Sequence, residues 1–157
     1  MNVEYINPFV QGAQNTINAI CGEKPSLGAV KVKQPPYSSD PIAITIEFFG
    51  SISGYGIYSM HESLACNIVS KMMMGAPVVA LDDMAKSAIS ELGNMVSGNV
   101  ATIIASRGAT IDIKPPALNV GTVPNIASAI LPEEKLISIP LSFADGGVFT
   151  IDILIRE

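Results

Sequence analysis

Three polar side chains in the second half of the sequence have the types and spacing that chemistry at a helix surface needs. Ser87, Glu91 and Asn94 follow one another at intervals of four and three residues. At about 100° per residue, they fall within an arc of roughly 60° on a helix. A carboxylate can pair with a cation, and a neutral carboxamide can donate to and accept from water. Gly93 and Gly98 carry no side chain to screen the three residues, so the set is typical of a site that acts on something outside the protein.

The three residues belong to a helical pattern that runs from Asp82 to Arg107. Asp82 and Asp83 suit the positive end of a helix, and Gly108 is a residue type that often ends one. Asn99 lies nearer the apolar side, so we expect it to be a hydrogen-bonded structural amide. The opposite side is apolar, and we expect it to face the core: Ala88, Leu92, Met95, Val96, Val100, Ile103 and Ile104.

Each candidate also has a plain structural interpretation. Glu91 and Asn94 could belong to an ordinary solvated helix face, and Ser87 could be a small polar residue at a contact rim. The single histidine, His61, follows a strand and precedes a helix, which favours a surface or capping position over a catalytic one. The run Met72–Met74 is more typical of core and interface packing than of an adaptable binding groove.

The rest of the sequence predicts an α+β fold, with helices packed on an antiparallel sheet. Ser59 and Glu62 have capping-box spacing before the second helix, and about twenty residues before the last two strands are expected to form a loop. Alternating and helical apolar patterns give the order α-β-β-β-α-α-β-β-β: residues 7–22, 29–33, 42–48, 52–60, 62–75, 82–107, 110–113, 136–143 and 148–155.

The sequence also contains a weak internal repeat. Each half has a helix, a glycine, a short strand, a proline pair and two further strands. When the halves are aligned, Asn7 and Val10 stand opposite Glu91 and Asn94, so the first half keeps the scaffold and lacks the polar pair. The match is short, and chance similarity is the alternative.

Composition limits the class of protein. The 157 residues are 48% hydrophobic and only 15% charged, which favours one folded domain over residues 1–157. A net charge of −5 with scattered basic residues argues against nucleic-acid binding. No window reaches the roughly 18 apolar residues of a membrane span, and no secretory signal is visible. Cys21 and Cys66 lack metal-type spacing, so we expect reduced thiols in a cytoplasmic protein.

The polar helix lies among other short motifs in a fixed order, namely Gly54–Gly56, Met74–Gly75, Leu81–Asp83, Ser87–Asn99 and Pro115–Pro116. Over most of the chain, this arrangement resembles the CheC/CheX/FliY family of chemotaxis phosphatases. The family consensus is Asp or Ser, three residues, Glu, two residues, Asn, and later a Pro. Ser87, Glu91 and Asn94 match it, and Pro116 follows Asn94 by twenty-two positions. CheC typically carries two such motifs and CheX one, in the second half, so the single motif here is most similar to CheX.

This resemblance implies a function and a role for each residue. CheX-like members remove the phosphoryl group from the aspartyl phosphate of the response regulator CheY. The resemblance implies that Asn94 positions the attacking water and that Glu91 pairs with the regulator's active-site lysine. Ser87, Gly98 and Pro116 would contact the regulator. Mg²⁺ would be supplied by the regulator, because no carboxylate cluster in this sequence is typical of a metal site, and no cofactor is expected in this chain.

Two other functions stay open from the sequence. The same fold could hold a receiver domain, or act as a flagellar-switch adaptor, without catalysis. Loss of the Glu/Asn pair would have favoured that alternative, and its presence favours the enzyme. A purely structural dimeric α+β protein is the third possibility, but it leaves the glycine-flanked polar face without an explanation.

A homodimer is the last expectation from the sequence. Mean hydropathy is +0.42, and the final strand has one strongly apolar face, made of Phe149, Ile151, Ile153 and Ile155. We expect this to be an edge strand that a two-fold interface covers, as the resemblance to CheX also implies. Glu91 and Asn94 would stay outside that interface, so that each subunit can engage one regulator.

Overall fold

The described residues fold as one antiparallel sheet of eight strands with three α-helices. We describe it from a computed structural model that covers residues 3–121 and 123–156. The strands are β1 (Ser26–Leu27), β2 (Lys31–Lys33), β3 (Ile42–Gly50), β4 (Ser53–Met60), β5 (Ile111–Ile113), β6 (Ala117–Val120), β7 (Leu136–Ser142) and β8 (Val148–Arg156). The helices are α1 (Ile6–Cys21), α2 (Glu62–Met72) and α3 (Asp83–Ser106), with short 3₁₀ turns η1 (Val3–Tyr5) and η2 (Asn125–Ala129). The α+β prediction is confirmed.

The strand order is symmetric about the centre of the sheet. It reads β1-β7-β8-β4-β3-β5, with β2 also beside β7 and β6 also beside β3. The central pair is β4 and β8, where Gly56 lies opposite Ile153. Exchanging the two halves of the chain maps β3 onto β7 and β4 onto β8. This is the arrangement that an internal repeat predicts.

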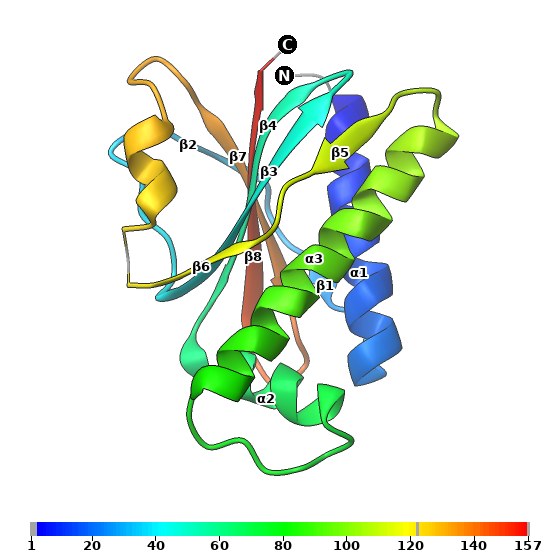
Figure 1. The fold of residues 1–157 in the computed structure, drawn as a ribbon, viewed down its shortest axis with the longest axis vertical. Coiled ribbons are helices and arrows are strands. Elements are labelled where there is room, and N and C mark those ends of the chain that lie inside the picture. The colour runs from blue at the N-terminus through cyan, green and yellow to red at the C-terminus, as the bar shows by residue number, and fades with distance from the viewer. Residues whose placement is uncertain (1–2, 122, 157) are drawn as a thin grey trace.

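Helices α1 and α3 lie side by side on one face of the sheet, and α2 lies at one end (Figure 1). The helices cover this face because it is apolar. In strand β3, for example, the alternate residues that are buried beneath the helices are Ile42, Ile44, Ile46 and Phe48. The two long helices approach each other closely at Gly12, where an added Cβ would lie 2.7 Å from Cγ2 of Val100. The glycine therefore fixes the spacing between α1 and α3.

The opposite face of the sheet is covered by irregular segments and η2 (Figure 1). Tyr37 packs there with Ile57 and Leu136 in a second, smaller core. This face also buries a charge, because Asp152 of β8 is fully buried and its Oδ2 lies 2.9 Å from Nζ of Lys33. The Tyr37 hydroxyl donates a hydrogen bond to the same oxygen. The Asp152 carboxylate thus links Lys33 of β2 and Tyr37, in the segment after β2, to strand β8 at the centre of the sheet.

Three local expectations are wrong. The segment before the final hairpin is not a plain loop, because it contains β6 and η2. The capping box does not form: Ser59 is buried within β4, His61 occupies the N-cap position of α2, and Glu62 accepts a hydrogen bond from the Leu81 amide. The last strand, β8, is not an edge, because it pairs with β4 on one side and β7 on the other.

Candidate active site

The candidate residues lie on α3, whose ends are set by local signals. The Asp82 side chain caps the helix, with Oδ1 accepting a hydrogen bond of 2.9 Å from the Ala85 amide. The other end is closed by Gly108, whose φ of +90° lies in the left-handed region that glycine adopts without strain. The helix predicted over residues 82–107 is therefore confirmed almost to the residue.

Two contacts pack α3 against the sheet. Gly93 is buried, and a Cβ added to it would lie 2.5 Å from Cγ2 of Ile44 in β3. The buried Ser97 hydroxyl lies 2.8 Å from the Tyr58 hydroxyl of β4. Burial holds the pKa of Tyr58 above its usual range, so this hydroxyl keeps its proton. Gly93 therefore faces the sheet rather than the polar trio, which corrects one expectation, whereas Gly98 has open space around it.

A third contact fixes α3 against α1. The Asn99 side-chain amide donates a hydrogen bond of 2.5 Å to the Thr16 hydroxyl. The expectation that Asn99 is a structural amide is confirmed. Together with Gly93 and Ser97, this bond sets the rotation of α3 about its own axis, and hence the direction in which the other side of the helix points.

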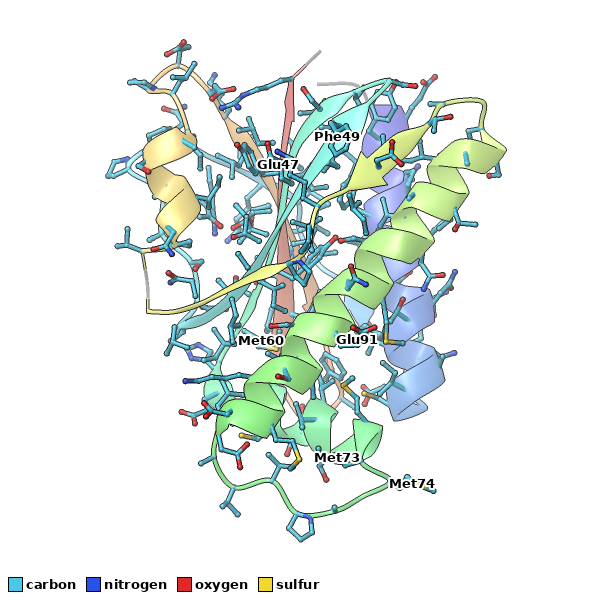
Figure 2. All side chains as sticks on the ribbon, in the orientation of Figure 1. Glu47, Phe49, Met60, Met73, Met74 and Glu91 are labelled. Carbon is cyan, nitrogen blue, oxygen red and sulfur yellow. The ribbon has the colours of Figure 1, made fainter. Side chains whose placement is uncertain are left out.

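The side that points away from the sheet carries the candidate residues. Ser87 and Glu91 are exposed, and Asn94 and Gly98 are half-buried. Glu91 lies near the middle of α3 (Figure 2). Among residues 3–121 and 123–156, the side chains of Ser87, Glu91 and Asn94 have no hydrogen-bond or ion-pair partner. The structure thus brings together an unpaired carboxylate and an unpaired carboxamide one helical turn apart, about 5–6 Å between their Cβ atoms.

The surroundings favour a large partner over a small one. Pockets of about 190 to 570 Å³ open on the described part of the chain, and five of them are lined by residues other than Ser87, Glu91 and Asn94. Sites for small molecules are normally concave. An open helix face suits a partner that brings its own concave reactive centre, as a protein substrate can.

The remaining sequence candidates lie elsewhere. Pro116 is half-buried in the link between β5 and β6, a segment that passes beside α3 (Figure 1). His61 is exposed at the start of α2, with Nε2 3.7 Å from Oδ1 of Asp40, so the interpretation as a surface or capping residue is confirmed. Met73 is half-buried, but Met74 is 98% exposed, so the packing expected for the methionine run does not extend to Met74.

Two methionines of α3 are exposed, and the sequence pattern predicted neither exposure. Met95 was expected in the core, but it is exposed, and so is Met84. Both lie near the border between the apolar and polar arcs, where the periodicity does not indicate whether a side chain is buried or exposed.

Within residues 3–121 and 123–156, no group of three or more His, Cys, Asp or Glu side chains could hold a metal ion. No helix in the same residues has the length and apolar character to cross a membrane.

The sequence is similar to that of known chemotaxis phosphatases. Residues 42–141 match the family model of the chemotaxis phosphatase CheX. The CheY-P phosphatase CheX of Thermotoga maritima is 29% identical to this chain over 156 residues, which cover 94% of this chain and all of the relative.

Solved structures of other proteins share the fold. A CheC-like superfamily protein from Shewanella sp. PV-4 superposes with a TM-score of 0.83 at 23% identity, over the full length of both chains. The CheX of Borrelia burgdorferi, solved as a complex of CheX, CheY, BeF₃ and Mg²⁺, gives a TM-score of 0.79 at 25% identity, over 99% of this chain and 100% of the other. Because the family model matches well over half of the sequence, the chain belongs to the CheX family of chemotaxis phosphatases, a family of hydrolases.

Proposed function

We propose that this enzyme hydrolyses the aspartyl phosphate of a CheY-like response regulator. The observation that carries the proposal is the pair Glu91 and Asn94 on the outer side of α3. Glu91 is exposed, Asn94 is half-buried, and neither side chain has a partner in the described chain, while Gly93 and Ser97 on the other side pack the helix against the sheet. The substrate named for the Thermotoga relative supports the same conclusion. So does the composition of the Borrelia complex, in which CheX is bound to CheY.

Asn94 would position the attacking water. In the reaction, the water oxygen forms a bond to phosphorus in line with the bond that breaks, and the aspartyl carboxylate leaves with the electron pair of that bond. Inorganic phosphate and a free carboxylate result, with the water proton released to solvent. Because the transferred group is already reactive, orientation and charge stabilisation supply most of the rate. A neutral carboxamide orients water without bringing a second negative charge to the phosphoryl group.

Glu91 would act on the regulator rather than on the phosphoryl group. A carboxylate beside phosphate is repelled, so it needs a cation from the partner, and we propose the regulator's active-site lysine. Glu91 has no cation of its own in the described chain, which leaves it free for that pairing. We place the Mg²⁺ of the reaction in the regulator, where acidic residues would hold it.

Ser87, Gly98 and Pro116 would contact the regulator around this pair. Ser87 lies one turn before Glu91, and Gly98 lies one turn after Asn94. The open space around Gly98 lets another backbone approach α3 closely. Pro116 would mark the edge of the contact, on the link that passes beside α3. The two free cysteines fit a reducing compartment, so we propose the cytoplasm as the place of action.

The direct test is the decay of a phosphorylated receiver domain with and without the protein. We expect catalytic amounts of the chain to speed the decay, and the rate to saturate as receiver concentration rises. Acetyl phosphate alone is the control. Its hydrolysis should not change, because small-molecule sites are normally concave and Ser87, Glu91 and Asn94 line none of the five pockets described above. Tight binding of the receiver without faster decay would instead assign the chain as a non-catalytic adaptor.

We also propose a homodimer, in which the final strand does not form the interface. Strand β8 is internal, but the β1–β2 edge exposes three apolar side chains, Leu27, Val30 and Val32, each about half exposed. An apolar sheet edge invites pairing with a second copy. Light scattering should give twice 16.5 kDa at micromolar concentration, and Val32→Lys should yield the monomer. A wild-type mass of one chain would refute the dimer.

A further inference from the structure

Two methionines on α3 are exposed although the helix has a continuous buried side. Met84 is 60% exposed and Met95 is 38% exposed, whereas the buried side chains of α3 include Ile89, Leu92 and Val96. Isolated apolar residues on a surface are ordinary and need no explanation. What these two share is their position relative to Glu91.

Met84, Ala88, Glu91 and Met95 form one stripe on α3. They follow one another at intervals of four, three and four residues, the spacing of neighbours along one side of a helix. With a rise of about 1.5 Å per residue, Met84 lies roughly 10 Å before Glu91 and Met95 roughly 6 Å after it. Helices that dock into a partner's groove place their apolar anchors at this spacing.

We infer that Met84 and Met95 are apolar docking contacts for the phosphorylated receiver domain, one on each side of Glu91. This inference rests on the proposed function. A protein substrate that brings its phosphoryl group to Asn94 must also cover the residues next to it, because a specific interface buries about 800 Å² on each partner. The methionine stripe is continuous with the catalytic pair, so the same partner covers both.

The chemistry of methionine suits this role. Its unbranched side chain adapts to the shape of a partner, and its burial leaves no polar group unpaired. The receiver would present apolar side chains on either side of its phosphorylation site. Because these contacts exist equally before and during the reaction, they lower KM and leave kcat unchanged.

Other exposed apolar residues do not share this position. Leu131 is 50% exposed, but it belongs to the segment between η2 and β7. That segment lies on the other side of the sheet from α3 (Figure 1). It therefore provides a matched control, since an exposed apolar residue is replaced there without touching α3.

The test uses the full chain and a phosphorylated CheY-type receiver, with steady-state dephosphorylation as the readout. The double variant Met84→Gln/Met95→Gln should raise KM about tenfold and keep kcat near the wild-type value. Met84→Leu/Met95→Leu should restore the wild-type KM, because leucine keeps the apolar contact. Leu131→Gln should leave both constants unchanged. Thermal unfolding of each variant checks that α3 still folds.

An unchanged KM in the glutamine double variant would overturn the inference while leaving the proposed phosphatase intact. A fall in kcat at unchanged KM would overturn it as well. If the wild-type chain did not speed the decay at all, the proposed function would fail instead. The role of the methionines could then still be tested by measuring binding to a receiver treated with beryllofluoride. Equal affinity of the wild type and the glutamine double variant would contradict the docking role.

Discussion

Gly93 of α3 lies directly over Ile44 of β3, so close that an added Cβ would stand 2.5 Å from the Ile44 Cγ2 atom. The contact lies one residue before Asn94, and it fixes both the distance of α3 from the sheet and its rotation. Glycine is required there because any side chain would push the helix outward.

Gly93→Ala should therefore lower the free energy of unfolding by about 1–3 kcal/mol, the usual cost of overpacking a core. Gly98→Ala is the matched control, since a Cβ there meets no atom within 4 Å. Alanine favours a helix over glycine by up to about 1 kcal/mol, so this variant should be as stable as the wild type or more so. Urea unfolding of the two variants measures both effects, and equal destabilisation would contradict the contact.

Two asparagines of α3 should differ in what they contribute to stability. Asn99 donates to Thr16 across the α1–α3 contact, so Asn99→Ala should cost about 1 kcal/mol, the net worth of one hydrogen bond. Asn94 has no partner in the described chain, so Asn94→Ala should change stability by no more than about 0.5 kcal/mol. Chemical unfolding would measure both values, and a large loss at Asn94 would show that it has a structural role.

Glu91 should affect binding to the regulator in a salt-dependent way. Its proposed partner is a lysine, so Glu91→Gln should weaken the complex with a phosphorylated receiver, and added salt should weaken the wild-type complex more than the variant's. Titrations at low and high salt would measure this. Glu62→Gln offers a control, because Glu62 is an exposed carboxylate that accepts a bond from Leu81 on another element. Identical salt dependence of wild type and Glu91→Gln would rule out the ion pair.

The second core predicts a loss of stability at alkaline pH. Burial and the nearby Asp152 carboxylate raise the pKa of Tyr37 well above its usual range. Because the pKa of Tyr37 is higher in the folded than in the unfolded protein, its protonated hydroxyl stabilises the folded state. This contribution is complete below the unfolded-state pKa of about 10. Above that pH, the free energy of unfolding falls by up to about 1.4 kcal/mol per pH unit. The Tyr37→Phe variant should be less stable than the wild type at pH 8. Between pH 10 and 11, however, its free energy of unfolding should fall less than that of the wild type. Thermal unfolding against pH checks this, and equal slopes would contradict it.

Local signals explain what the sequence predicted well. The cap at Asp82, the apolar repeat and Gly108 all act within a few residues, so the bounds of α3 could be predicted from them. The alternation in β3 works in the same way. The position of Asn99 on the apolar side was enough to predict a bonded amide, although Thr16 as its partner was not predicted.

Features that depend on distant pairing were predicted poorly. The central place of β8 follows from its pairing with β4, almost a hundred residues earlier, and nothing in its own apolar pattern distinguishes an internal strand from an edge. The exposure of Met95 depends on the rotation of α3, which Gly93 and Ser97 set through contacts with the sheet. The action of Glu91 and Asn94 on a phosphoryl group depends on a partner that brings this group to α3, so the sequence of this chain alone does not encode it.

The central claim is that Asn94 positions water for hydrolysis of a receiver's aspartyl phosphate, and single-turnover decay at saturating protein tests it most directly. The phosphorylated receiver is mixed with excess wild-type chain or Asn94→Ala, and loss of phosphate is followed with time. We expect the variant to bind the beryllofluoride-treated receiver as well as the wild type does, and to hydrolyse the phosphorylated one on the order of 10²-fold more slowly, the effect of losing one oriented polar group. A saturated decay rate equal to that of the wild type would contradict the mechanism.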